Sequence, residues 1–421
     1  KSAPRGLSVP PTMTESPPPP ARRPPLTDVF RHRNYRLFFA GQLLSLMGSW
    51  MQTIGQAWLV YKLTGSPLAL GLIGFLQQGP VFFFSVLGGT VADRVDRRRL
   101  IMLTQAAFLV QAATLAVLSF TGLVELWHVA CLALVFGLLN AVDVPTRQSF
   151  TVEMVGRADL QSAIALNSIM FNMARVVGPA VAGVTIAMVG ESWCFAINAF
   201  SYLAVLTSLF LMRVMPFVRP SEMQHPLKDI AEGFRYLIAH REIRTALLAL
   251  AVSSFAGGPY LTMMPVFARE VLGADADGYG LLMTTVGAGA LCGALAMGRL
   301  RPDLLAKAPS VAAIGFGIFL VAFSFARSFP LAMALILPTA FCLMLQGSAT
   351  NISVQMAVDD RMRGRVMAYY TMSFLGMMPF GSLAAGAVAA QIGVPLTLTC
   401  GGIVCALGGI ASLWLRRRQP G

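Results

Sequence analysis

The chain has 421 residues, of which 56% are hydrophobic and 12% are charged, and its mean hydropathy is +0.67. A soluble domain carries about 25% charged residues, so this composition excludes a soluble enzyme and indicates a polytopic membrane protein. The formal net charge of +13 does not indicate a nucleic-acid partner, because the basic residues lie between apolar runs rather than in one patch.

Residues 1–27 precede the first long apolar run. Nine of the 25 prolines fall within residues 1–26, and large apolar residues are scarce there. This composition predicts a disordered cytoplasmic tail rather than a signal peptide, since no apolar core precedes a cleavage site. The basic and aromatic residues at 28–36 predict an anchor for the first helix at the lipid headgroups.

Twelve apolar runs follow, each long enough to cross a bilayer as a helix. We therefore predict an all-α polytopic membrane protein with twelve transmembrane helices. The predicted spans are residues 37–61, 68–92, 100–120, 126–146, 160–188, 192–213, 244–268, 279–299, 308–326, 329–351, 366–390 and 394–415.

The spans fall into two groups of six. Residues 28–213 are predicted to form an N-terminal six-helix bundle, and residues 244–418 a C-terminal one. The linker between them, residues 214–243, has apolar residues at helical spacing opposite a charged face, which predicts an amphipathic helix on the inner membrane surface. A weak repeat of short motifs at an offset of about 200 residues supports two related halves.

The basic residues distribute unevenly between the two membrane faces. Of the 32 lysines and arginines, 28 fall in the tails and alternate short loops, while the opposite loops hold Lys62, Arg269 and Arg327. Basic loops stay in the cytoplasm. We therefore predict a multi-pass protein of the bacterial plasma (inner) membrane with both termini cytoplasmic.

The turn at residues 88–99 joins the second and third spans and carries five charged side chains before Arg99. One interpretation is a plain positive-inside loop. The turn also resembles the loop between helices 2 and 3 of the major facilitator superfamily, Gly-x-x-x-Asp-Arg-x-Gly-Arg-Arg. The matching residues are Gly89, Asp93, Arg94, Arg97 and Arg98. Asp96 stands where that pattern has its second glycine. The resemblance implies a cytoplasmic gate in which Asp93 pairs with arginines or a helix N-terminus.

The resemblance extends over nearly all of the chain from residue 30 to residue 418. The stretches 58–66, 174–179, 197–199 and 363–367 are similar to the enterobactin-exporter-like and macrolide-efflux-like bacterial branch of this superfamily. It implies two six-helix bundles around a cavity lined by helices 1, 4, 7 and 10, and transport coupled to protons.

The first span carries a polar stripe. Its members share about 100° of the helix surface and include Gln42, Ser49, Gln52 and Gln56. These side chains either bond to other helices or line a water-filled substrate path, and the resemblance favours the path. Beside the stripe, glycines recur every seven residues, which predicts a surface for close packing of a neighbouring helix.

Arg175 lies near the middle of the fifth span, where an arginine costs about 2.5–3.5 kcal/mol on the insertion scale. Asn172 and Pro179 share its helical face. The structural interpretation is a charge satisfied by neighbouring carbonyls and amides. The functional one is a cavity cation that gates the path or meets an anionic or polar substrate, together with Asn172.

Asp143 is the acidic residue that lies inside a predicted span, with Asn140 and Arg147 on the same face. It either pairs with Arg147 to close the helix before Pro145 ends it, or forms a gate or protonation site. Asn140 is placed on the predicted substrate path.

Gly178, Pro179 and Gly183 resemble the Gly-Pro element of helix 5 in exporters of the superfamily. Proline bends a helix and glycine permits tight crossing, so these residues are predicted to form a hinge or a seal.

These features predict a secondary active transporter, not an enzyme, that exports an amphipathic siderophore-like or drug-like molecule by alternating access and proton antiport. The alternative is a membrane protein that flips lipid or lysophospholipid. The expected partners are a small-molecule substrate, a proton and membrane lipid. We expect no cofactor, no metal and a monomer.

Overall fold

The computed structural model describes residues 26–92, 94–213, 226–297, 301–305, 307–359 and 361–417, and these are helices joined by short turns. Asp93 and nearly all of the predicted N-terminal tail lie outside the described residues. The N-terminal half contains a 3₁₀ turn η1 (Leu26–Arg31), α1 (Arg33–Thr64), α2 (Pro67–Ala92), α3 (Arg97–Phe120), α4 (Leu126–Val189) and α5 (Ser192–Leu211).

The linker and the C-terminal half follow, with π-helical turns inside two of the crossings. Their elements are α6 (Pro226–Ala239), α7 (Arg241–Val252), η2 (Ser253–Gly257), α8 (Tyr260–Val266), η3 (Phe267–Val271), α9 (Ala276–Met297), α10 (Pro302–Leu305), α11 (Ala308–Ser324), α12 (Phe329–Ala357), α13 (Arg363–Thr371), η4 (Met372–Gly376), α14 (Met377–Ile392) and α15 (Val394–Arg417).

Ten helical segments in the described chain are long and apolar enough to cross a membrane. The shorter apolar helix α11 adds an eleventh crossing. Helix α1 adds the twelfth, since its 32 residues are long enough to cross a membrane. The predicted twelve-helix fold is confirmed. An even number of crossings brings Leu26 and Arg417 to one end of the molecule, here called the terminal end; the opposite one is the far end.

Helix α4 differs from its prediction, because it contains two crossings and the first does not end before Pro145. That crossing continues to Gly156, and the next begins at Asp159. A proline removes one amide donor and frees the carbonyl four residues earlier. Here the freed carbonyl belongs to Ala141, and Gly88 of α2 lies against it, so the helix continues through the proline.

This arrangement recurs: a glycine of one helix lies against the carbonyl that a proline frees in another. A Cβ on each of these glycines would approach the carbonyl oxygen to between 2.0 and 2.7 Å. The sets, written as proline, carbonyl and glycine, are Pro80, Leu76 and Gly137; Pro145, Ala141 and Gly88; Pro179, Arg175 and Gly287; Pro259, Phe255 and Gly381. Such close approach permits weak Cα–H···O contacts and covers polar backbone inside the membrane.

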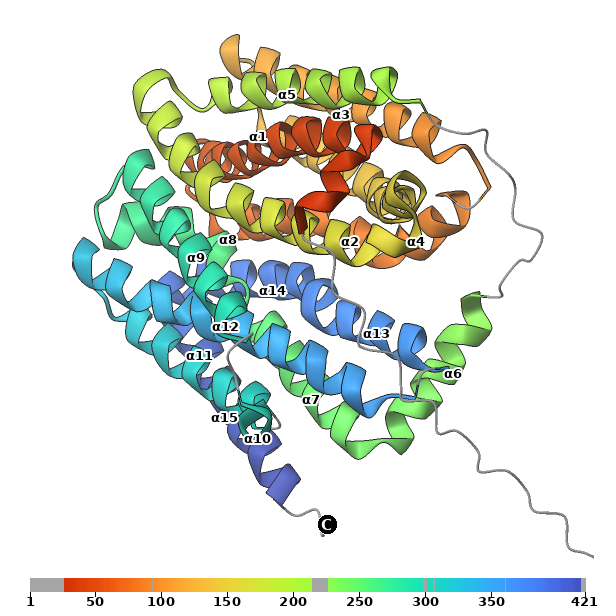
Figure 1. Cartoon of the computed structure of the whole chain (residues 1–421). Coiled ribbons are helices and arrows are strands. Elements are labelled where there is room, and N and C mark those ends of the chain that lie inside the picture. The colour runs from red at the N-terminus through yellow and green to blue at the C-terminus, as the bar shows by residue number, and fades with distance from the viewer. Residues whose placement is uncertain are drawn as a thin grey trace, which may run out of the picture.

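The two halves share one apolar core toward the far end. It includes Trp58 of the N-terminal half, whose ring stacks on Tyr279 of the C-terminal half with centroids 5.9 Å apart. Toward the terminal end each half has its own smaller core, one containing Tyr35 and Phe150, the other Val354. In Figure 1 the ribbons of the two halves accordingly converge at the left and separate toward α6 at the right.

The linker helix α6 lies against α13 at the terminal end. Glu232 of α6 forms an ion pair with Arg365, and the Tyr236 hydroxyl donates to Asp359 at 3.2 Å. The predicted linker helix is therefore present and joined to the C-terminal half. Its position on a membrane surface remains a prediction.

The contact between α2 and α4 predicts a difference between two adjacent glycines. In Gly88→Ala the new Cβ would meet the Ala141 oxygen at 2.0 Å, whereas in Gly89→Ala it would meet no atom within 4 Å. We expect Gly88→Ala to lose about 1–3 kcal/mol of stability through overpacking. Gly89→Ala should be neutral or slightly stabilising, because alanine favours the helix. The melting temperatures of the two purified variants test this, and equal values would contradict it.

Candidate functional site

The glycine face of α1 packs on α5, as the seven-residue spacing predicted. A Cβ on Gly48 would lie 2.6 Å from Asn198 Oδ1, and one on Gly41 would lie 2.6 Å from Ser208 Oγ. The neighbour, α5, was not predictable from α1 alone. This packing turns the polar stripe of α1 into the interior of the N-terminal half.

Gln52 is the centre of that interior. Its amide donates to Gln111 Oε1 of α3 at 3.1 Å, and its Oε1 accepts from Asn198 Nδ2 of α5 at 2.7 Å. The Ser49 hydroxyl lies 3.4 Å from that of Tyr202. These bonds join α1, α3 and α5 within one bundle.

The other two predicted glutamines, Gln42 and Gln56, are also buried, and one amide atom of each has no hydrogen-bond partner among the described residues. Of the two interpretations of the stripe, bonding between helices describes Ser49 and Gln52 in this conformation. A role for Gln42, Ser49, Gln52 and Gln56 in a substrate path remains a prediction.

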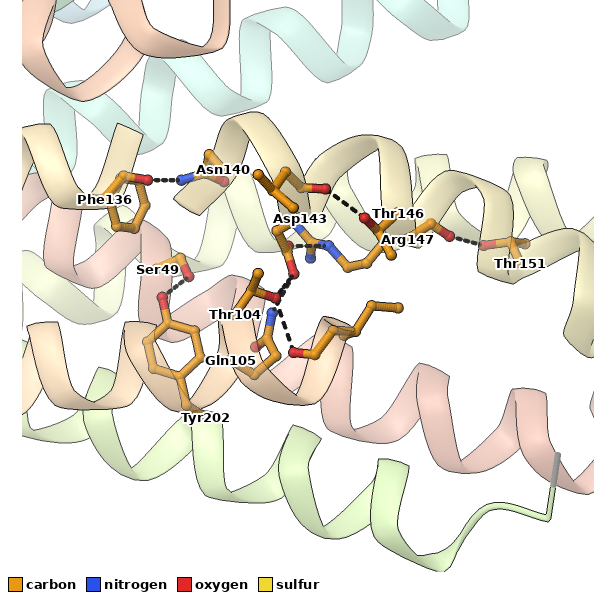
Figure 2. Close-up of polar contacts among 12 residues, drawn as sticks. Ser49, Thr104, Gln105, Phe136, Asn140, Asp143, Thr146, Arg147, Thr151 and Tyr202 are labelled. Carbon is orange, nitrogen blue, oxygen red and sulfur yellow. Dashed lines mark hydrogen bonds and ion pairs between the residues drawn. The ribbon is translucent and has the colours of Figure 1, made fainter. Parts of the chain in front are cut away.

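Asp143 is fully buried between α3 and α4 (Figure 2). Its Oδ1 accepts from the Thr104 hydroxyl at 2.7 Å and from Gln105 Nε2 at 3.1 Å. Arg147 Nε lies 2.6 Å from Oδ2, as an ion pair rather than a well-aligned hydrogen bond. The predicted Asp143–Arg147 pair is present, but it lies in mid-helix instead of closing one. Asn140 is not joined to it and donates to the Phe136 carbonyl at 3.0 Å.

The first residues of α3 are basic and fix this end of the helix to α4 and α5. Arg97 pairs with Glu153 of α4, and Arg98 donates to the carbonyls of Leu209 and Phe210 at 2.8 and 3.0 Å. Those carbonyls belong to the C-terminal end of α5, where cations are favoured.

Asp96 explains the departure from the superfamily pattern in this turn. It is the N-cap of α3, and its side chain accepts from the Arg99 amide at 3.1 Å. Arg94 is exposed, and its amide donates to the Val91 carbonyl at 3.0 Å. The gate role of Gly89, Arg94, Arg97 and Arg98 remains a prediction.

Arg175 lies on α4 where this helix crosses α9 of the other half. Its carbonyl is the one freed by Pro179 and covered by Gly287. The side chain is half-buried, and its guanidinium makes no hydrogen bond or ion pair within the part of the chain that the structure describes. Its electrostatic neighbour is Tyr260, a buried phenol with no hydrogen-bond partner among the described residues. The expected satisfaction of the charge by carbonyls and amides is therefore not seen.

Asn172 and the Gly-Pro element surround Arg175 on α4. Asn172 is half-buried, and its amide donates to the Ser168 carbonyl at 2.8 Å. Gly178 lies against Trp50 of α1, and Gly183 against Gly280 of α9.

The Gly-Pro element packs α4 between the two halves without breaking it. Within α4, whose backbone is described throughout, the one residue with non-helical angles is Gly156. A hinge at Gly178, Pro179 and Gly183 remains a prediction.

Several polar residues of this interior were not among the predicted site residues. The signal was available for Thr104 and Gln111, which are polar residues seven apart in an apolar span and therefore share one face. Gln105 and Asn198 each have a partner on another helix, Asp143 and Gln52, which the sequence alone does not identify. Tyr260 appears in the sequence as an ordinary aromatic residue.

Comparison with known proteins gives a family model described as "Transmembrane secretion effector", which matches residues 26–420. The chain is 28% identical over 375 residues to a staphyloferrin A transporter of Staphylococcus aureus, covering 87% of this chain and 92% of that protein. It is 26% identical over 278 residues to the enterobactin exporter EntS of Shigella flexneri, covering 65% of this chain and 66% of that one.

Two solved structures share the fold. A bacterial homolog of the human lysosomal transporter Spinster superposes with a TM-score of 0.69 at 14% identity, covering 93% of this chain and 99% of that chain. A mutant of the nucleoside transporter NupG has a TM-score of 0.72 at 11% identity, with the same coverage.

The burial of Asp143 predicts a large effect of removing its cation. Arg147→Ala leaves a buried carboxylate without its counter-charge, which costs about 3–5 kcal/mol. In the double variant Asp143→Asn/Arg147→Gln both charges are absent, and the asparagine oxygen still accepts from Thr104, so most of the stability should return. Unfolding by denaturant titration measures both. Wild-type stability of Arg147→Ala would contradict the prediction.

Proposed function

Because the chain belongs to the transmembrane secretion effector family, within the major facilitator superfamily, we propose that it exports an amphipathic small molecule by alternating access. The relatives named above transport or export siderophores, staphyloferrin A in one case and enterobactin in the other. A siderophore-like molecule is therefore the first substrate class to test, and a drug-like molecule the second.

The observation that carries the proposal is the position of Arg175. A cation within a membrane span is costly and usually faces a cavity or a partner. Here it lies at the crossing of the two halves with a guanidinium that no acidic side chain of the described chain neutralises. An anionic group of the substrate would supply that charge when the halves are apart, so substrate and conformation are coupled at this residue.

Orientation follows from the distribution of basic residues. The turn with Arg94, Arg97 and Arg98 lies at the terminal end, so the positive-inside rule assigns that end and both termini to the cytoplasm. The shared apolar core at the far end then closes the outer side. The separate cores at the terminal end are what an inward-facing state of such a transporter would have, and they support the proposed alternating access in the bacterial inner membrane.

Asp143 is the best candidate for proton coupling. It is buried, and its α3 partners Thr104 and Gln105 can hold either protonation state, since hydroxyl and amide groups rotate to donate or accept. Protonation would remove the charge that holds Arg147, its ion-pair partner one turn away on the same helix.

The role of Arg175 predicts that Arg175→Ala abolishes export while the protein still inserts. Inside-out vesicles with an imposed pH gradient and a panel of siderophores, dyes and antibiotics measure uptake. Arg175→Lys keeps the charge and should retain part of the activity. The control Arg235→Ala removes an exposed arginine of α6 and should transport normally. Wild-type flux in Arg175→Ala would remove this residue from the mechanism.

The role of Asp143 predicts that Asp143→Asn uncouples transport from the gradient. The variant should still exchange labelled substrate for unlabelled substrate across the membrane, because exchange needs no net proton movement. Accumulation driven by the pH gradient should fall to the level measured without a gradient, because asparagine cannot carry the proton. Gradient-driven accumulation at the wild-type level would contradict the assignment, and wild-type flux without any gradient would favour the lipid-flipping alternative.

A further inference from the structure

A pocket of about 430 Å³ lies in the C-terminal half, toward the terminal end. It is formed by α9, α12 and α13. Its lining residues are Ala294, Met297, Ser348, Asn351, Ile352 and Tyr370. None of these side chains is charged, and half of them are polar.

The polar side of the pocket is organised by hydrogen bonds. The Tyr370 hydroxyl donates to the Gly347 carbonyl at 3.2 Å and interacts with the Asn351 side chain. Asn351 Oδ1 accepts from Gln355 Nε2 at 2.6 Å, which fixes the orientation of the amide. The ring of Tyr370 packs on Phe374 with centroids 6.0 Å apart. A rigid amide, a phenol and a serine hydroxyl beside Met297 suit a neutral ligand group that carries hydroxyls or amides on an aromatic or apolar frame.

The position of the pocket relative to Arg175 follows from the register of α4 on α9. Gly183 lies against Gly280, and Val176 lies against Gly287. Between these two contacts the residue number on α4 falls by seven while the residue number on α9 rises by seven, so the two helices are antiparallel. Ala294 lies seven residues beyond Gly287, on the same face. At 1.5 Å per residue this places the pocket about 10 Å from the level of Arg175, toward the terminal end.

We propose that this pocket and Arg175 bind opposite ends of one transported molecule. The substrate is an elongated acid with a carboxylate or similar anionic group at Arg175. About 10 Å away, a neutral group rich in hydroxyls or amides lies against Ser348, Asn351 and Tyr370. This inference rests on the proposed export function and adds the substrate class and the C-terminal half of the site. Since the two ends lie on different halves, the molecule bridges the parts that must move during transport.

Binding of a matched pair of probes to the purified full-length protein tests the proposal. The probes are N-(2,3-dihydroxybenzoyl)serine, which has a carboxylate at one end and a catechol amide at the other, and its primary carboxamide. For the wild type, equilibrium dialysis should give an affinity at least about tenfold higher for the acid, as expected for one charge-assisted hydrogen-bonded contact. Arg175→Gln should remove that preference and bind both probes equally.

Asn351→Leu tests the other end. It keeps the side-chain size and removes the amide, so it should weaken acid and carboxamide alike by about fivefold to tenfold and leave the preference for the acid intact. The control Thr371→Val changes an exposed residue of α13 outside the pocket lining and should bind as the wild type does. Monodisperse elution of each variant shows that it is folded.

Three results would overturn the inference: equal wild-type affinity for acid and carboxamide, loss of the acid preference in Asn351→Leu, or unchanged affinity in that variant. Failure of the acid to bind the wild type at all would overturn the substrate class. The export proposal would still be decided separately by gradient-driven uptake of the broader panel in vesicles, because that measurement does not depend on these probes.

Discussion

The contact between a glycine and a proline-freed carbonyl is the constraint on which the helix packing depends. Gly88 covers the Ala141 oxygen inside the N-terminal half, and Gly287 covers the Arg175 oxygen between the halves. A carbonyl without an amide donor is costly in hydrocarbon unless another group covers it. The same contact that makes a proline tolerable also brings two helix backbones close enough to fix their register. The positions of Asp143 and Arg175 relative to the bundles follow from these crossings.

The two intramembrane charges have different surroundings. Asp143 lies in a closed polar interior, with its hydrogen-bond partners on α3 and its ion-pair partner on α4. Arg175 lies where the two halves meet, next to the phenol of Tyr260 and without a carboxylate in the described chain. A neutralised charge inside one half suits an ion that is carried, and a cation between halves suits a ligand that links them. The proposed division of roles between proton and substrate rests on this contrast.

Local patterns in the sequence predicted where the helices lie better than they predicted which helices pack against each other. Hydropathy located the crossings, and the glycine spacing of α1 predicted a packing face, but only the structure identifies α5 as its neighbour. The prediction that a helix ends at Pro145 was wrong, because the glycine that covers the carbonyl freed by this proline lies on α2, far away in the sequence. The intramembrane position of Arg175 was evident from its apolar flanks. The pocket at Asn351 and Tyr370 was not, since it forms only when three separate helices come together.

Asp143 and Arg175 lie on the two arms of α4, which are joined at Gly156 without an intervening loop. Its two crossings meet at Gly156, whose angles of φ 70° and ψ 176° belong to a region that other residues essentially do not adopt. Because no loop separates the two arms, their ends stay together at Gly156 when either arm tilts. Proton release and substrate movement would then be coupled through the main chain of α4, and an insertion of several residues at Gly156 would let each arm move independently.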